Sequence, residues 1–117
     1  MAEAFEQAAL AMMAVITDLR TVTPTSEVEI ACKAPSPDLL LLDWLNALVL
    51  EMAAESLVFG SFTVAIDGTS LTATARGEKV DVGRHQPAVE VKGATMTELS
   101  VARGSDGLWR AQCIVDV

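Results

Sequence analysis

The sequence predicts an α+β domain with two packed helices and a mainly antiparallel sheet. Two segments, residues 2–18 and 38–55, repeat apolar residues every three or four positions, as amphipathic helices do. The second half of the chain instead alternates apolar and polar residues, which is typical of half-buried strands. Asp67-Gly68 and Asp106-Gly107 interrupt this alternation and are strong hairpin-turn signals.

The first helix is expected over residues 2–18, because its apolar side chains fall on one face. These side chains are Phe5, Ala8, Ala9, Met12, Met13, Ile16 and Leu19. Residues 23–26 (Thr-Pro-Thr-Ser) are helix breakers. After them Val28, Ile30 and Cys32 alternate with charged residues, which predicts a half-exposed strand.

The second helix is expected from about Asp38 to Glu55, after the turn and helix-start residues Pro35-Ser36-Pro37-Asp38. Its apolar face is broad enough to make it the central packing element. That face comprises Leu39, Leu41, Leu42, Leu45, Leu48, Val49 and Met52.

Two hairpins should follow the second helix. Segments 57–66 and 70–78 flank the first Asp-Gly turn, and segments 90–103 and 108–117 flank the second. Between the hairpins, residues 76–87 are rich in glycine and ionisable side chains and are expected to form the one long polar loop, a usual location for function.

Composition narrows the class of protein. The 117 residues suffice for a single domain, 1–117, and carry a net charge of -8 with scattered basic residues. Direct nucleic-acid binding is not expected, because it depends on clustered Lys and Arg. No apolar run is long enough for a membrane span, and the first residues lack a signal-peptide pattern, so a cytoplasmic location is expected. Cys32 and Cys113 are expected to be buried thiols without a disulfide.

The chain end is the first candidate site. Asp116 closes the last predicted strand and is followed only by Val117, so two carboxylates lie side by side and could hold a hard cation. The alternative is a solvated acidic end that keeps an edge strand from pairing.

Lys92 and His85 are further candidates. Lys92 could meet a phosphate or carboxylate at the same end of the sheet, or could be an outward edge charge. His85, the only histidine, could be a loop residue hydrogen-bonded to backbone. A small hydrolase or phosphotransferase could use Glu78, His85 and Lys92, provided that they share one pocket. Trp44 and Trp109 are expected in the core.

The chain resembles the archease family over essentially its whole length. The residues that carry the resemblance are Glu3-Ala-Phe-Glu-Gln-Ala-Ala-Leu-Ala-Met12, Asp43-Trp-Leu-Asn46, Leu57-Val-Phe59, Gly77-Glu78, His85, Glu90-Val-Lys92 and the closing segment Asp106–Val117.

The resemblance implies a small acidic accessory factor that is not itself an enzyme. Archeases assist the RtcB-type RNA-splicing ligase of tRNA processing, promoting its guanylylation and turnover, and bind a divalent cation, often calcium. By this resemblance Asp116 matches the C-terminal metal ligand, and Val117 the last residue, whose main-chain oxygens join it. Lys92 matches the family's functional lysine, and with His85 it is expected to be linked to the partner or to nucleotide.

The chain departs from the family at two places. Archeases have a strand and an acidic metal-binding motif before the first helix, whereas this sequence starts at the helix, and Thr95-Met96-Thr97 replaces other residues after the lysine. Without that strand a sheet edge would be exposed, and a homodimer could cover it. The chain could also be a degenerate dimeric remnant that has no metal site.

Overall fold

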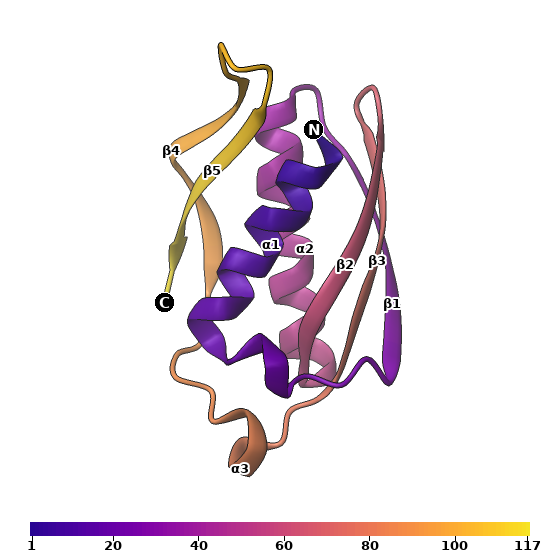
Figure 1. Cartoon of the computed structure of the whole chain (residues 1–117), viewed down its shortest axis with the longest axis vertical. Helices are drawn as coiled ribbons and strands as arrows, with labels where there is room; N and C mark the ends of the chain where they lie inside the picture. Colours follow the sequence, from indigo (N-terminus) through magenta and orange to yellow (C-terminus); the bar gives the residue numbers. More distant parts are fainter.

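The computed structural model describes residues 1–117 as three layers (Figure 1). Two antiparallel sheets form the outer layers, and the two long helices lie between them. In chain order the elements are α1 (Ala2–Ile16), a 3-10 turn η1 (Leu19–Thr21), β1 (Ser26–Lys33), α2 (Pro37–Glu55), β2 (Leu57–Asp67), β3 (Ser70–Lys79), α3 (Val82–His85), β4 (Gly93–Arg103) and β5 (Trp109–Asp116).

The second helix begins and ends where its sequence directs it. Ser36 is the N-cap, and its hydroxyl accepts the Leu39 N–H at 3.3 Å. Pro37 occupies the first turn, where its missing N–H costs nothing. Ser56 ends the helix in the left-handed conformation, with a φ of 53°, and its N–H donates to the Met52 carbonyl.

The first sheet has the strand order β1-β3-β2. Its hairpin turns at Gly68, which has a φ of 61° that glycine adopts without strain. A bulge between Phe59 and Ser61 shifts the β2–β3 register, and Gly77 of β3 lies directly against this bulge. This sheet packs its apolar face on the helices.

The second sheet contains only β4 and β5, paired from Gly93↔Asp116 to Arg103↔Trp109. The register shifts between Thr95 and Ser100, where β4 bulges and Glu98 takes a φ of 50°. Gly107 makes the turn with a φ of 82°. The two strands lie over the helices on the side opposite the first sheet (Figure 1).

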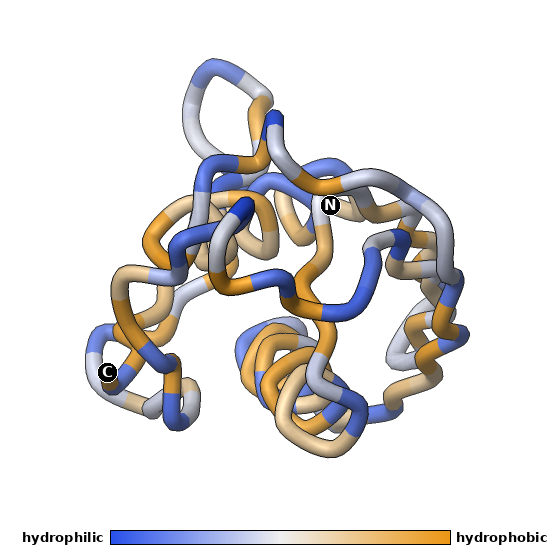
Figure 2. Tube along the Cα trace, turned by 90° about the horizontal axis from the view of Figure 1, so that it is seen from below, coloured by the Kyte–Doolittle hydropathy of each residue, from blue (hydrophilic) through white to orange (hydrophobic).

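The hydrophobic core lies between the layers. Trp44 of α2 is fully buried and donates its indole N–H to the Phe5 carbonyl of α1 at 3.1 Å. Its ring packs edge-on against Phe62, with the ring centroids 5.8 Å apart. The helices show their apolar residues in orange in Figure 2. Neither α1 nor α2 has the length and hydrophobicity of a membrane-spanning helix.

The α+β class, the antiparallel pairing, both long helices and both Asp-Gly turns are confirmed. Three expectations were wrong. The strands form two sheets, one on each side of the helices, and not a single sheet. The expected long loop is largely structured, because β3 extends to Lys79 and Asp81 caps the helical turn α3. Trp109 is 39% exposed, because it lines an open groove between α1 and the start of β5.

Candidate functional site

The structure brings Lys92 and Asp116 together at the end of the second sheet. The Lys92 main-chain N–H donates to the Asp116 main-chain carbonyl at 2.7 Å, and Gly93 pairs with Asp116 in the ladder. Both side chains are exposed, as is Val117. This end of the molecule therefore offers an ammonium group and two carboxylates to solvent within one strand end.

Asn46 of α2 positions this strand end from behind. Its Oδ1 accepts the Ala94 N–H at 2.8 Å, and a side chain on Gly93 would meet the same oxygen at 3.4 Å. Further along β4, the Asp38 carboxylate accepts the Val101 N–H at 2.7 Å. The outer edge of β4 is thus fixed to α2 by side chains, and the Lys92–Asp116 end is fixed with it.

The oxygen donors at this strand end are of the type that binds hard cations, but they are fewer than such a cation requires. Asp116 and Val117 supply carboxylate oxygens, and Ca²⁺ takes about six to eight oxygen ligands. No group of three or more His, Cys, Asp or Glu side chains comes together anywhere in the chain. Asp116 and Val117 alone therefore supply fewer oxygens than a complete calcium site needs.

Glu78 and His85 meet in a second, buried cluster at the α3 end of the first sheet. The Glu78 carboxylate is only 8% exposed and accepts hydrogen bonds from the Thr23 N–H and the Arg84 guanidinium. His85 Nε2 lies 3.5 Å from Glu78 Oε2. A carboxylate buried to this degree is stabilised by such charged and N–H partners.

The hydrogen bonds of His85 define its tautomer and its role. Its Nδ1 accepts the Asp81 N–H at 2.8 Å, so the proton of the neutral ring is on Nε2, which has no hydrogen-bond partner. Its carbonyl accepts the Thr17 hydroxyl. These contacts tie α3 to the end of α1, so the expectation of a histidine bonded to backbone is confirmed, although the residue is buried in a helical turn.

The three groups of the hydrolase alternative do not share a pocket. Lys92 lies at the β4–β5 end, hydrogen-bonded to Asp116, whereas Glu78 and His85 lie between α3 and the η1 segment. None of the three lines either of the two main surface pockets. The geometry favours a structural clip over an acid-base pair.

Sequence reasoning missed Asn46, Arg84 and Thr23 as supporting residues. The sequence does indicate a structural role for Asn46, because an amide on the broad apolar face of a helix needs a buried hydrogen-bond partner. Nothing in the sequence indicates the contacts of Glu78 with Thr23 and Arg84, because they depend on how η1 and α3 meet in space.

Both cysteines are free, as expected, but they are half-buried and not fully buried. Burial raises the pKa of the Cys32 thiol, and the negative charge of Asp43 raises it further. Burial also raises the pKa of Cys113, and a backbone hydrogen bond with Thr95 offsets part of this rise. Neither thiol is therefore activated as a nucleophile or a metal ligand.

Comparison with known proteins places the chain in a family. The model of the Archease protein family matches residues 1–117. A protein archease from Methanosarcina barkeri is 38% identical over 98% of this chain and 82% of its own length. That from Pyrococcus furiosus is 36% identical over 98% of this chain and 84% of its own length.

Solved structures agree with this match. The solution structure of Methanobacterium thermoautotrophicum protein 1598 superposes with a TM-score of 0.85 at 35% identity, covering 99% of this chain and 84% of that one. The crystal structure of an archease and possible chaperone from Thermotoga maritima shares the fold, with a TM-score of 0.62 at 18% identity over 95% of this chain and 79% of that one. On these grounds the chain belongs to the archease family.

Proposed function

We propose that this chain is a non-enzymatic accessory factor of an RtcB-type RNA ligase in tRNA splicing, promoting the ligase's guanylylation and turnover. Its exposed strand end, with Lys92 beside Asp116, is the part that acts on the ligase. The observation that carries the proposal is the 2.7 Å bond that brings these two residues together in a member of the archease family.

The charge of the chain supports such a partner. A net charge of -8 suits docking to a basic surface, and an enzyme that handles RNA is positively charged around its active site. The acidic chain itself is unsuited to direct RNA binding. The name of the Thermotoga maritima relative, a possible chaperone, also describes a protein that acts on another protein.

A divalent cation, with calcium the first choice, is proposed at Asp116 and Val117. Because these two residues supply too few oxygen ligands, water or the docked ligase would complete the coordination. Calcium alone is then expected to bind weakly, and the ligase is expected to strengthen its binding.

The proposed setting is the cytoplasm, where free cysteines persist. We also propose that the chain self-associates. His85 contributes to the partner-linked function only indirectly, through the clip that it forms with Thr17 and Asp81.

The test is a guanylylation assay of an RtcB-type ligase with GTP, with and without this protein. Asp116→Asn and Lys92→Ala should lower the stimulation at least about tenfold, the equivalent of about 1.4 kcal/mol. Their matched controls are Asp67→Asn, at an exposed strand end of the first sheet, and Lys33→Ala, at the exposed end of β1. Equal stimulation by all four variants would exclude this strand end as the active part.

The degenerate-remnant alternative makes the opposite prediction for the unmodified protein. If the chain is such a remnant, it should be fully folded but should neither stimulate a ligase nor release heat on addition of calcium. Calorimetry with calcium on the wild type, on Asp116→Asn and on the wild type with ligase distinguishes the two cases.

A further inference from the structure

Strand β4 carries three more residues than its pairing with β5 uses. Regular pairing from the turn stops at Ser100 and resumes at Thr95, and β5 contributes only Cys113 to the same stretch. Residues 96–99 of β4 therefore stand opposite a single residue. Most bulges add one residue to a strand, so an insertion of this length is a separate feature of the sheet.

The second sheet does not need the inserted residues Met96-Thr97-Glu98, which we call the β4 excursion. Leu99 on one side of it and Ala94 on the other both pack against the hydrophobic core. If the excursion were absent, Leu99 would pair with Cys113 and the ladder would continue unbroken, with the same side chains directed at the helices. The end of the ladder that carries Lys92 would keep its register.

The excursion strains the backbone and is nevertheless held in one shape. Glu98 has a φ of 50°, in the left-handed region that residues other than glycine rarely adopt. Its carbonyl accepts the Gln112 side-chain N–H at 3.0 Å. The Thr97 N–H donates to Thr95 Oγ1 at 3.3 Å, and that hydroxyl donates to the Ile114 carbonyl at 2.9 Å. Strained segments that their surroundings fix in this way are frequent at binding sites.

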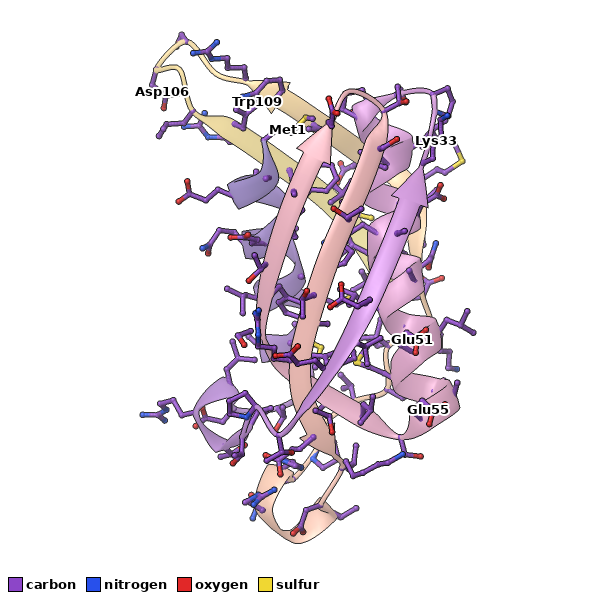
Figure 3. All side chains as sticks on the ribbon, turned by 90° about the vertical axis from the view of Figure 1, so that its right-hand side faces the viewer. Met1, Lys33, Glu51, Glu55, Asp106 and Trp109 are labelled. Atoms are coloured by element: carbon purple, nitrogen blue, oxygen red, sulfur yellow. The ribbon has the colours of Figure 1, made fainter.

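The side chains of the excursion are exposed to solvent. Met96 is 69% exposed, and Thr97 and Glu98 are exposed as well. Figure 3 looks onto the first sheet, and the second hairpin, with Asp106 at its tip, passes behind the helices. The excursion therefore belongs to the side of the molecule that faces away from the first sheet. A flexible methionine on such a surface adapts well to an irregular apolar hollow.

The neighbours of the excursion indicate the chemistry of a partner. Ile114 is 40% exposed and pairs with Thr95, the residue before Met96. The exposed carboxylates of Glu98 and Asp116 border these two apolar side chains. A surface with an apolar hollow bordered by lysine or arginine would complement this arrangement. The net charge of -8 favours the same kind of partner.

We propose that the β4 excursion is a docking element that inserts Met96 into an apolar, basic-bordered hollow on the partner protein. This inference rests on the proposed function, in which the partner is an RtcB-type ligase. The strand end with Lys92 and Asp116 then changes what the ligase does, whereas the excursion increases the affinity between the two proteins. Because Gln112 and Thr95 already fix its shape, little conformational freedom is lost on docking.

The first experiment measures ligase guanylylation over a range of concentrations of this protein. Met96→Ser should raise the concentration that gives half-maximal stimulation at least about tenfold and leave the maximal stimulation unchanged. The control is Leu50→Ser on α2, where the side chain is 67% exposed and the response should match wild type. An unchanged half-maximal concentration in Met96→Ser would overturn the docking role alone. No stimulation by the wild type would refute the proposed function, and the docking role with it.

The carboxylate of the excursion gives a second, independent test. Glu98→Lys keeps a long side chain at this position and reverses its charge, so the half-maximal concentration should rise. The rise should be smaller at high salt, because exposed charges are screened. Asp67→Lys, at an exposed strand end of the first sheet, is the control. An equal rise in both variants would assign the effect to the net charge of the chain and overturn the docking role.

A deletion of residues 96–98 separates docking from positioning of the strand end. The Lys92 amide, which donates to the Asp116 carbonyl, should exchange its hydrogen as slowly as in the wild type, because the ladder keeps its register. The half-maximal concentration should rise as in Met96→Ser. Faster exchange at Lys92 with a lower maximal stimulation would show that the excursion positions the strand end, and would refute docking.

A second copy of this chain is the other occupant that the experiment must distinguish. Light scattering of the wild type and of Met96→Ser should give the same mass at each concentration. If Met96→Ser alone became monomeric, the excursion would be a contact between copies of this chain, and docking to the ligase would be refuted.

Discussion

The main-chain N–H of Lys92 donates to the carbonyl of Asp116 at 2.7 Å, so a basic and an acidic side chain leave the same strand end. The bond is made by the backbone, and both side chains stay exposed. Their exposure leaves them free for a partner or an ion. The strand end keeps this geometry because Asn46 holds Ala94 from the opposite side of β4.

Replacing Asn46 by alanine should therefore loosen the strand end. The variant leaves the partly buried Ala94 N–H without its acceptor, which typically costs about 1–3 kcal/mol. Asn46→Asp keeps an acceptor oxygen and should lose less. Urea denaturation measures both, with Asp43→Ala, at an exposed position of the same helix, expected within about 0.5 kcal/mol of wild type. Equal losses in Asn46→Ala and Asp43→Ala would contradict the anchoring role of Asn46.

Gly77 should not tolerate a side chain. A Cβ at this position would fall on the Val58 carbonyl oxygen and lie 2.8 Å from the Phe59 Cα, and both are backbone atoms of the neighbouring strand that cannot move aside. Gly77→Ala should destabilise the fold by about 3 kcal/mol or more, the range of severe core overpacking. Thermal unfolding gives the comparison with Gly83→Ala, where the added Cβ meets only Asp81 Oδ1 at an ordinary 3.5 Å. A Gly77→Ala variant as stable as Gly83→Ala would show that the bulge can open.

The sequence was sufficient for the elements whose signals are local. Periodicity located both long helices, and Asp-Gly pairs located both turns. It could not show that the second hairpin packs on the far side of the helices, because the same alternation suits one sheet or two. For that reason Trp109 was assigned to the core, although it lines the open groove between α1 and the start of β5.

The candidate site was predictable in part for the same reason. Lys92 and Asp116 could be expected at the same end of the sheet, but not their direct contact. The register set at the turn would pair Asp116 with Met96, and only the bulge in β4 moves it to Gly93, next to Lys92. The supporting bond from Asn46 and the Glu78–Arg84 pair join segments distant in sequence, and only the packed structure reveals them.

Asp18 should titrate far below an ordinary aspartate. Hydrogen bonds from the Arg20 side chain and N–H, with its charge, lower the pKa of Asp18 to about 2. Because the folded-state pKa is lowered, any stability that the pair contributes is present above the ordinary pKa of 3.8 and is lost as pH falls toward 2. The side chains are exposed, so the effect on stability should be small, and NMR titration of the carboxylate is the suitable measurement.

The control for Asp18 is a second pair of the same kind. A hydrogen bond from Arg110 lowers the pKa of Asp106. Arg20→Ala should return the pKa of Asp18 toward 3.8 and leave that of Asp106 in place, and Arg110→Ala should do the reverse. If one arginine variant moved both carboxylates, the shifts would have a global cause and not a local one.

The buried Glu78 cluster should contribute more stability than an exposed ion pair. Glu78→Gln removes the negative charge that pairs with Arg84. It should lower the free energy of unfolding by about 1–3 kcal/mol, because the partners of this buried carboxylate lose their charged acceptor. Glu55→Gln breaks an exposed pair with Lys79 at 3.7 Å and should cost at most about 1 kcal/mol. Urea denaturation of the two variants compares the pairs directly.

The same variant tests whether the cluster holds the segment that leads to Lys92. His85 and the bond from the Ala88 N–H to the Ile16 carbonyl, at 2.8 Å, anchor this segment to α1. If Glu78 maintains that anchor, Glu78→Gln should speed hydrogen exchange at Ala88 more than at Ala94, which Asn46 holds independently. Equal acceleration at both amides would mean that the variant weakens the whole fold and that Glu78 has no specific role in placing Lys92.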